Sequence, residues 1–374
     1  MSPVTPGTDD REGARLAPYA MHGRDSAGRR YPEPPDPLRG PYEVDRARII
    51  HSAAFRRLSH KTQVFTGERS DYHRTRLTHT FEVSVVARTL GRALALNEDL
   101  IEALALAHDL GHPPFGHAGE DVLNRSLAPW GGFNHNRQAL RIVEQLERFD
   151  RRFPGLNLTA EVLDGQTERT PSRLPHLRPL LEVQAVDAAD SITYDTHDAD
   201  DALYLGLLQL DELLEVPLWK SAAARVRGQS ANLSGEELSW AVLQELINWQ
   251  LTDVIGSARQ KIRDSSIQSV ADVQHAAPVM VATAELAEQK RNLERFLFER
   301  VYKHPQVLEF RSKAQQALAE LFEHLVRHPE LLPARFASRV AGDGLERTVG
   351  DYVADMTDRY ALAQHRAIVG ASEA

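Results

Sequence analysis

Four residues that are far apart in the sequence have side chains that could together hold one divalent metal ion. They are His79, the adjacent pair His108 and Asp109, and Asp190. Two imidazoles and two carboxylates leave positions open for water and phosphate oxygens, which suits a hydrolytic metal site. Adjacent residues on a helix point about 100° apart, so the His-Asp pair can reach one ion only near a helix end, which Gly111 predicts. Taken alone, each residue has a simpler interpretation than a metal ligand. Each histidine could be a core residue with its hydrogen bonds made, and each aspartate could be solvated or cap a helix.

The run from His108 to Glu120, HDLGHPPFGHAGE, places three histidines and two acidic residues within thirteen positions. Its glycines and prolines predict an elbow that turns the chain back over the helix end. If a helix restarts after the elbow, His117 and Glu120 lie three residues apart on one face, so the carboxylate can bind one imidazole nitrogen while the other faces a substrate. The run therefore predicts an acid/base dyad. A surface helix with ordinary polar residues is the alternative.

The elements that must position these residues are predicted to be helices. From about residue 42 onward, apolar residues recur at spacings of three and four, whereas alternating strand-like runs are hard to find, so the fold class is predicted to be all-α. Asn97 should start a helix whose inward face carries His108, Thr78 should open the helix of His79, and Pro179 should begin the helix of Asp190. Further amphipathic helices are expected near residues 238–260, 279–302, 312–327 and 345–364.

The composition narrows the kind of site and the location of the protein. None of the 374 residues is a cysteine, which excludes disulfides, thiolate metal sites and a cysteine nucleophile. Residues 1–40 contain twelve prolines or glycines and predict an irregular N-terminal arm. Neither a signal-like segment nor an apolar stretch of about 18 residues is present, so we expect a cytoplasmic protein without a membrane span.

Positive charge is concentrated early in a chain whose net charge is −9. Residues 1–80 hold 14 Lys and Arg against 10 Asp and Glu. For most of these cations we expect salt bridges on solvated helix faces, and a few could face a phosphate-rich ligand. The cations in question are Arg46, Arg48, Arg56, Arg57, Lys61, Arg69, Arg74 and Arg76.

Long motifs in this chain closely resemble those of the HD-domain dNTP triphosphohydrolases, the bacterial dGTPase-like family. The resemblance spans most of the chain beyond residue 30, and the length fits the shorter bacterial subgroup. The motifs are RTRLTH at 74–79, HDLGHPPFGHAGE at 108–120, FNHN at 133–136, Ala189-Asp190 with Tyr194 and His197-Asp198, and further runs at 48–52, 55–58, 61–64, 155–159 and 351–361.

The resemblance implies an all-α HD-domain fold, with a metal-dependent phosphohydrolase core at 41–205 and additional C-terminal helices at 206–374 packed on the core. It implies that His79, His108, Asp109 and Asp190 are the ligands of a divalent metal ion, for which we expect Mn²⁺ or Mg²⁺, with Fe²⁺, Ni²⁺ and Zn²⁺ as alternatives. The other site residues implied are His117, Glu120 and His112 as catalytic residues and Arg76, His135, Tyr194 and Asp198 as substrate-binding residues.

The implied reaction is attack of water on the α-phosphorus of a dNTP, which releases a deoxynucleoside and tripolyphosphate. Arg76 would contact phosphate, whereas Tyr194 and Asp198 would line the sugar. The family also implies a homo-oligomer and a dNTP activator. The base preference, the native metal, the direction of proton transfer by His117 and the role of Arg359 and Tyr360 stay open.

The chain departs from the family pattern at three positions, and two other functions remain alternatives. Ser59 stands where many members have glutamine, Ser191 where some have a phosphate-holding lysine, and Thr193 where alanine is usual. One alternative is another HD-type nucleotide phosphohydrolase, a nucleotidase or phosphodiesterase. The other is an HD-fold regulator that binds single-stranded nucleic acid through its basic segment.

Overall fold

The computed structural model describes residues 13, 15–63, 74–167, 169, 178–230 and 232–368 of the chain, which is helical almost throughout. The N-terminal half contains η1 (Gly23–Asp25), α2 (Pro41–His51), α3 (Ala53–Arg57), η2 (Leu58–His60), α4 (Arg76–Ala93), α5 (Glu98–Ala107), α6 (Gly116–Ser126), η3 (Ala128–Trp130), α7 (His135–Arg141), η4 (Ile142–Leu146), α8 (Ala160–Thr167) and α9 (Leu181–Tyr204). The C-terminal half contains α10 (Leu210–Leu213), α11 (Pro217–Gln229), α12 (Gly235–Asp264), α13 (Val270–His275), α14 (Ala284–Leu297), η5 (Phe298–Tyr302), α15 (Pro305–Arg327), η6 (Pro329–Leu331), α16 (Ala334–Ala337), α17 (Val340–Asp343), α18 (Leu345–Asp355) and α19 (Asp358–Ile368).

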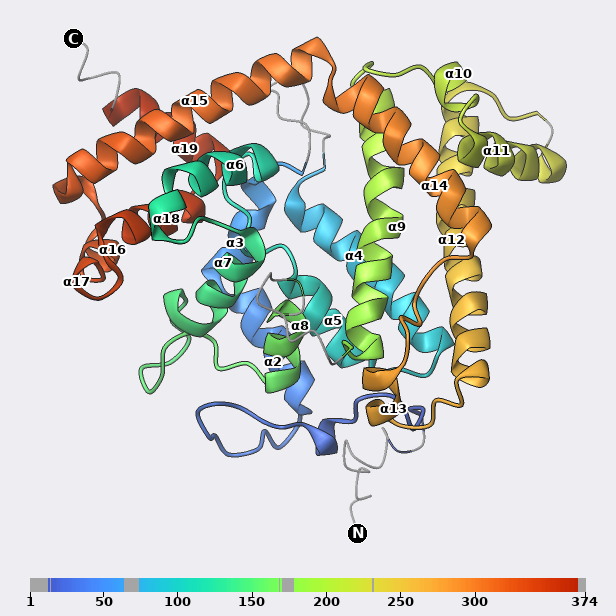
Figure 1. Cartoon of the computed structure of the whole chain (residues 1–374), viewed down its shortest axis with the longest axis horizontal. Coiled ribbons are helices and arrows are strands. Elements are labelled where there is room, and N and C mark those ends of the chain that lie inside the picture. The colour runs from blue at the N-terminus through green and yellow to red at the C-terminus, as the bar shows by residue number, and fades with distance from the viewer. Residues whose placement is uncertain are drawn as a thin grey trace.

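The prediction of an all-α fold is confirmed, because the described backbone contains helices and three isolated bridges but no strand. Helices α4, α5 and α9 lie at the centre of the molecule (Figure 1), and their apolar faces form one buried cluster with α2 and the C-terminal part of α12. Leu90, Ile101 and Val186 are nearly inaccessible members of this cluster. Burial of apolar side chains of this size stabilises the fold by about 1.5–3 kcal/mol each.

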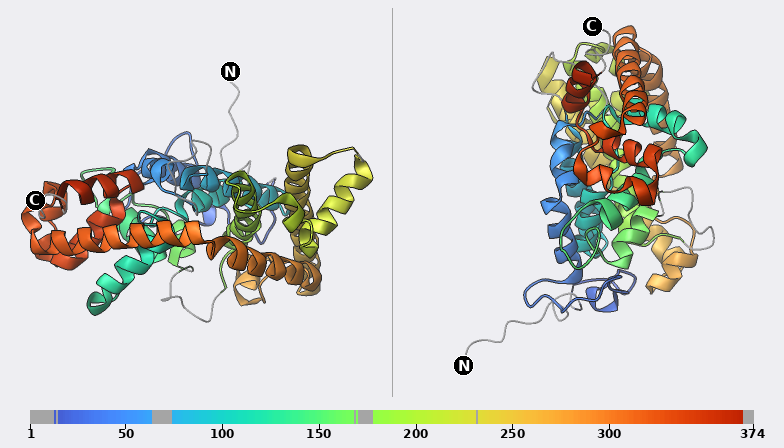
Figure 2. Two further views of the ribbon diagram at one scale, coloured as in Figure 1. Left: turned by 90° about the horizontal axis from the view of Figure 1, so that it is seen from above. Right: turned by 90° about the vertical axis from the view of Figure 1, so that its left-hand side faces the viewer.

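Two further apolar clusters join the C-terminal helices to the central helices. One lies between the C-terminal part of α9 and helices α11, α12 and α14, and includes the buried Trp219. The other lies between α6 and helices α15, α18 and α19. In the view from above, α15 runs along one side of the molecule between these two regions (Figure 2). The C-terminal helices thus contact the centre on both sides, while a domain boundary near residue 205 stays a prediction.

Several predicted helix ends are wrong by a few residues, for local reasons. Helix α4 starts after Thr75, not at Thr78. The Thr75 hydroxyl accepts a hydrogen bond from the Thr78 backbone N–H, and the Thr78 hydroxyl accepts one from the Thr75 backbone N–H. Helix α9 starts at Leu181, two residues after Pro179. The helix predicted over 345–364 is two helices, α18 and α19, interrupted at 356–357. Asn97 caps α5 as predicted.

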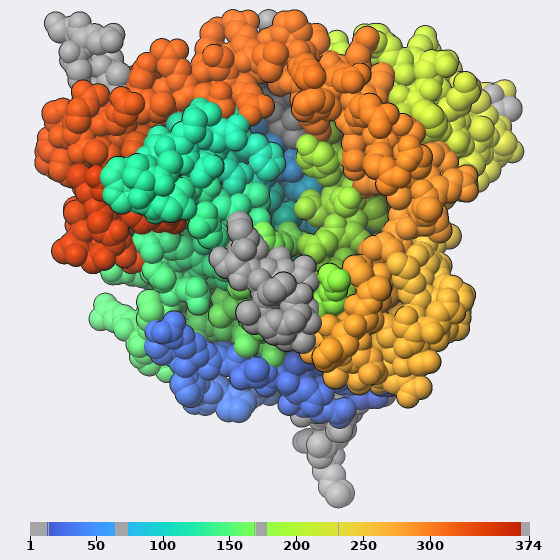
Figure 3. All heavy atoms as spheres, viewed as in Figure 1, coloured from blue at the N-terminus to red at the C-terminus, as the bar shows by residue number. Residues whose placement is uncertain are grey.

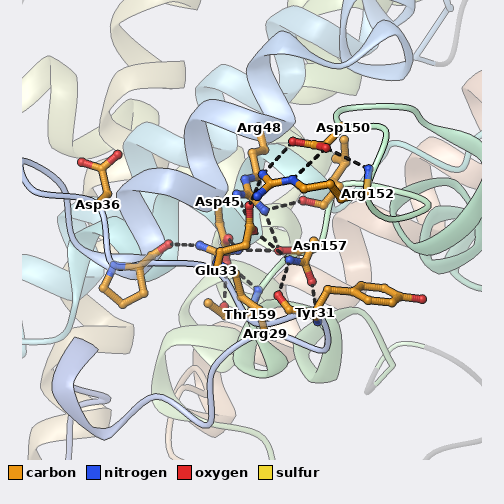
Figure 4. A network of polar contacts seen from close by, with 12 residues as sticks. Arg29, Tyr31, Glu33, Asp36, Asp45, Arg48, Asp150, Arg152, Asn157 and Thr159 are labelled. Atoms are coloured by element: carbon orange, nitrogen blue, oxygen red, sulfur yellow. Dashed lines mark hydrogen bonds and ion pairs between the residues drawn. The ribbon is translucent and has the colours of Figure 1, made fainter.

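The described part of the N-terminal arm is irregular apart from η1, and polar contacts tie it to the core (Figure 4). Arg29 forms an ion pair with the buried Asp45 of α2 and donates to the backbone oxygen of Asn157. Glu33 accepts hydrogen bonds from Arg48 at 2.7 Å and from the Asn157 side chain at 2.8 Å. Because these groups are largely shielded from water, the contacts fix the arm more firmly than exposed ion pairs would.

No helix within the described ranges combines the length and the apolar character that crossing a membrane requires.

Candidate functional site

The structure brings the four predicted metal ligands together where α4, the end of α5 and the middle of α9 meet. The Nε2 atom of His79 lies 3.1 Å from Oδ1 of Asp190, and Nε2 of His108 lies 3.4 Å from Oδ1 of Asp109 and 3.9 Å from Oδ1 of Asp190. One ligand atom from each of His79, His108 and Asp109 lies within 4.8 Å of the others. The α-helix α5 ends at Ala107, so the His-Asp pair follows the helix end as its spacing requires.

The chemistry of these side chains fits a divalent metal ion. Nδ1 of His108 lies 2.6 Å from the Ala105 carbonyl oxygen, so it must carry the proton and leave a lone pair on Nε2. That Nε2 atom is buried without a hydrogen-bond partner among the described residues, as is Nδ1 of His79. Buried nitrogen atoms without a partner are rare in folded proteins, and a metal ion would satisfy the His108 nitrogen. The four residues can therefore hold a divalent metal ion.

Arg76 lies against the candidate metal site and contacts one of the four predicted ligands. Its side chain is only 2% exposed, and Nη1 donates to Oδ2 of Asp109 at 2.9 Å. Burial would favour the neutral form of Asp109, but the neighbouring His108 imidazole and Arg76 guanidinium outweigh burial and hold the pKa of Asp109 well below the usual range. A Cβ atom on Gly116, whose φ is +55°, would come within 2.6 Å of Nη2 of Arg76. Glycine at this position of the elbow therefore makes room for the guanidinium.

The predicted dyad of His117 and Glu120 is present, but it contains a third member. Helix α6 restarts at Gly116 as predicted, and Nδ1 of His117 lies 3.1 Å from Oε2 of Glu120. The same carboxylate accepts hydrogen bonds from Nδ1 of His135 at 2.8 Å and from its backbone N–H at 2.9 Å. Burial of Glu120 favours its neutral form, but the hydrogen bonds from both imidazoles outweigh it and lower its pKa far below the usual range.

His112 joins the dyad region to the metal site. Its Nε2 atom lies 3.2 Å from Oδ1 of Asp109, and its ring stacks on the ring of His135 with 4.0 Å between centroids. Burial lowers the pKa of His112 well below its ordinary value, with the nearby Arg76 acting in the same direction, so its imidazole is neutral at pH 7. A Cβ atom on Gly111 would lie 1.9 Å from the backbone oxygen of His135, so glycine permits this approach.

Tyr194 and Asp198 lie one and two turns beyond Asp190 on α9, as predicted. Asp198 is fully buried, and its Oδ2 atom accepts a hydrogen bond from the hydroxyl of Tyr302 in the π-helical turn η5. Burial raises the pKa of Asp198 to about 7. The rings of Tyr194 and Tyr302 lie 6.5 Å apart. Sequence reasoning missed Tyr302, because no local pattern relates it to a partner 104 residues away.

A lysine from another helix lies beside Ser191, where some relatives of the resembled family carry lysine. Lys290 of α14 contacts the backbone oxygen of Ser191 and forms an ion pair of 3.0 Å with the buried Asp195. Burial raises the pKa of Asp195 to about 6. In this chain the ammonium group beside this part of α9 therefore comes from Lys290 of α14. In the relatives with lysine at the position of Ser191, it would come from α9 itself.

The surface is hollowed between α6 and α9, beneath the orange chain of α14 and α15 (Figure 3). In each of the two clusters, the predicted metal ligands and the group around Glu120, the most exposed residue lies on one of these two helices. The His117 side chain on α6 is 66% exposed and the Asp190 side chain on α9 is 38% exposed, whereas His79, His108, Asp109 and His112 are buried. Each of the two clusters therefore has a member that reaches the surface on one of the helices that border this hollow.

The elbow between α5 and α6 is held by two side chains, Lys61 and Asp358, which also link it to the C-terminal region and whose role sequence reasoning missed. The buried Lys61 donates to the backbone oxygens of His112 at 2.5 Å and of Ala354 at 2.9 Å, and burial lowers its pKa to about 8. Asp358 accepts hydrogen bonds from the backbone N–H groups of Thr62 at 3.0 Å and of Phe115 at 2.9 Å. Phe115 has a left-handed backbone with φ of +62°, so this elbow needs outside support.

We expect replacement of Asp358 by alanine to lower turnover about a hundredfold, because a displacement of about 1 Å at a catalytic group can cost that much. The variant loses the acceptor for the Phe115 N–H of the elbow and for the Thr62 N–H beside Lys61, and it should leave bound metal unchanged. Asp272→Ala is the matched control, since Asp272 likewise accepts a hydrogen bond from a backbone N–H group, that of Gln268, in another part of the chain. Equal turnover of the two variants in steady-state assays would show that Asp358 does not position the elbow.

The structure also locates the remaining residues that the sequence singled out. Arg46, Arg48, Arg57 and Arg74 form ion pairs with carboxylates, which confirms the interpretation of salt bridges for them. Arg359 is exposed, and the Tyr360 hydroxyl lies 3.2 Å from that of Tyr352. Two of these residues fall outside the described ranges. They are Arg69 and Val64, the last residue of the motif at 61–64.

Comparison with known proteins gives matches over nearly the whole chain. The HD domain family matches residues 76–195, and the phosphohydrolase-associated domain family matches residues 280–367. A deoxyguanosinetriphosphate triphosphohydrolase-like protein of Ralstonia pickettii is 42% identical over 372 residues, which cover 96% of this chain and 95% of that protein. Deoxyguanosinetriphosphate triphosphohydrolase-like protein 1 of Deinococcus radiodurans is 45% identical over 366 residues, which cover 96% of this chain and 98% of that protein.

Proposed function

Since the chain belongs to the deoxyguanosinetriphosphate triphosphohydrolase-like family of HD-domain phosphohydrolases, we propose that it hydrolyses dNTPs to deoxynucleoside and tripolyphosphate. One observation carries this proposal. The metal site and the group of His117, Glu120 and His135 adjoin each other, because His112 lies 3.2 Å from the ligand Asp109 and stacks on His135. An ion that binds phosphate and a group that transfers protons would then act on the same phosphate ester.

The proposed chemistry divides between the ion and the protein. The bound ion, Mn²⁺ or Mg²⁺ in this proposal, would neutralise charge on the α-phosphate and make water more acidic. His117 would transfer a proton through its exposed ring, with Glu120 holding the ring and stabilising its charged form. The neutral, buried His112 would hold Asp109 through its single N–H group, and Arg76 would also hold Asp109 and add positive charge.

The proposed sugar site is the wall formed by Tyr194, Asp198 and Tyr302. Tyr302 binds Oδ2 of Asp198, so Oδ1 would accept a hydrogen bond from a 3′-hydroxyl. The ring of Tyr194, close to that of Tyr302, would occupy the space that a 2′-hydroxyl needs. Contacts of this kind favour deoxyribose over ribose, because an unpaired or displaced polar group costs binding energy.

We expect Tyr302→Phe to lower kcat/KM for dNTPs about tenfold to a hundredfold. The variant removes a hydrogen bond to a buried carboxylate, and such bonds contribute about 1.5–3 kcal/mol. Bound metal should stay the same, since Tyr302 does not reach the metal ligands. Tyr19→Phe is the control, because its hydroxyl binds the Leu94 carbonyl in another part of the core. If the two variants had the same kcat/KM for dNTPs and the same preference over rNTPs, the sugar site would lie elsewhere.

The proposed function is tested by incubating the metal-loaded protein with each dNTP and each rNTP, singly and mixed, and separating the products by chromatography. Deoxynucleoside and tripolyphosphate are expected from one or more dNTPs, and mixtures would reveal activation of one dNTP by another. Asp190→Ala should abolish both products. Formation of a nucleoside monophosphate and pyrophosphate would contradict the proposal and favour another HD-type nucleotide phosphohydrolase. Retention of single-stranded nucleic acid with no turnover would favour a regulator.

A further inference from the structure

A second group of side chains beside the metal site has the composition of a zinc site. His112, His117, Glu120 and His135 each offer one ligand atom, and these atoms lie within 4.8 Å of one another. Two ligands of a tetrahedral zinc ion lie about 3.4 Å apart, because bonds from zinc to nitrogen or oxygen are about 2.1 Å long. Glu120 lies 3.1 Å from Nδ1 of His117 and 2.8 Å from Nδ1 of His135, so small movements would suffice to surround an ion.

The donor atoms distinguish this group from the four metal ligands described above. Three imidazoles and one carboxylate form a nitrogen-rich set, which favours zinc-like ions over Mn²⁺ and Mg²⁺. His112 is also buried, and its Nδ1 atom has no hydrogen-bond partner among the described residues. Its ring stacks on His135, so His112 lies at the edge of the group, and His117, Glu120 and His135 are the three residues best placed to bind.

We propose that His117, Glu120 and His135, with His112 beside them, form a second divalent-cation site that binds a zinc-like ion and inhibits the enzyme. The inhibition rests on the proposed function, because it follows from loss of the His117–Glu120 dyad. An imidazole whose Nδ1 atom is bonded to a metal ion cannot keep the hydrogen bond to Glu120 that orients it for proton transfer. The site would make turnover sensitive to free zinc.

The residues can change from the metal-free to the metal-bound arrangement without a change of charge on either ring. Each imidazole now donates its Nδ1 proton to Glu120, and each would carry that proton on Nε2 when Nδ1 binds the ion. The backbone N–H of His135 would still donate to Oε1 of Glu120, as it does at 2.9 Å, and so keep the carboxylate in place. The exposed side of His117 gives the ion a route from solvent.

The number of zinc ions bound tests the site without reference to activity. Metal-free, full-length protein is dialysed against zinc, and bound zinc is measured by atomic emission. We expect two equivalents in the wild type, and one each in His79→Ala and in His135→Ala. Glu120→Gln, which preserves the shape of the side chain, should also hold one. His275→Ala, which removes an exposed histidine bonded only to the Ala271 carbonyl, should hold two.

A cobalt titration identifies the geometry of the second site. The visible bands of tetrahedral Co²⁺ should appear in His79→Ala and be absent in His135→Ala. One zinc equivalent in the wild type would overturn the proposal, and so would two equivalents in both His135→Ala and Glu120→Gln.

Inhibition is measured separately, by adding zinc to the manganese-loaded protein. We expect at least a tenfold loss of dNTP turnover while bound manganese stays at one equivalent. A loss of turnover that only follows the release of manganese would overturn the inhibitory role. If the protein turned over no dNTP at all, the proposed function would fail, and the zinc count would still decide whether the second site exists.

Discussion

Replacement of Asp109 by alanine should abolish metal binding and hydrolysis and should also lower the free energy of unfolding by about 3–5 kcal/mol. Asp109 is both a metal ligand in our proposal and the partner of the buried Arg76, at 2.9 Å. Its removal would leave a guanidinium that is only 2% exposed without its carboxylate. Breaking one side of a buried ion pair costs more than the pair contributes, because the remaining charge stays desolvated.

Asp190→Ala is the matched comparison for this prediction. Asp190 lies 3.1 Å from the buried His79 and is partly exposed, and within the described ranges it forms no ion pair with a lysine or arginine. We expect it to lose metal and turnover as completely as Asp109→Ala, with a change in stability within about 1 kcal/mol. Urea unfolding of the metal-free proteins measures the change in the free energy of unfolding that each substitution causes, without the stabilisation that bound metal adds. Metal retained by both variants would show that the ion binds elsewhere.

Replacement of His117 by alanine should lower turnover by about 10²–10⁴ and leave the metal in place. The reason is that His117 transfers a proton in our proposal and does not belong to the four metal ligands. Its side chain is 66% exposed, so the free energy of unfolding should stay within about 0.5 kcal/mol of the wild type. Steady-state kinetics and metal analysis on one preparation measure both properties.

His365→Ala is the control for His117→Ala. His365 of α19 forms a similar histidine–carboxylate contact, 2.6 Å from Glu320, on the surface of the C-terminal helices. Its removal should leave turnover unchanged. Loss of metal from His117→Ala would assign His117 to the metal site and not to proton transfer, whereas equal turnover of the two variants would remove His117 from the mechanism.

The sequence was sufficient for the residues whose position depends on helix periodicity and on one long motif. His108 and Asp109 lie at the end of a helix because Gly111 follows, and His117 meets Glu120 because they are three residues apart on α6. The all-α fold follows from spacing that is repeated over the whole chain. These features depend on residues close together in the sequence, so they can be predicted without knowledge of distant contacts.

The features that sequence reasoning missed depend on contacts between distant residues. His135 joins Glu120 only because the chain returns to the elbow at Gly111, and Tyr302 reaches Asp198 only because η5 packs against α9. Asp358 binds backbone groups 243 and 296 residues away. Neither spacing nor propensity encodes such pairs, because tertiary packing brings them together.

The most direct test of the proposed reaction is hydrolysis of a dNTP in water labelled with ¹⁸O, followed by mass spectrometry of the products. We predict one labelled oxygen in tripolyphosphate and none in the deoxynucleoside, because water attacks the α-phosphorus and the bond to the 5′ oxygen breaks. Label in the deoxynucleoside, or products other than these two, would contradict the account.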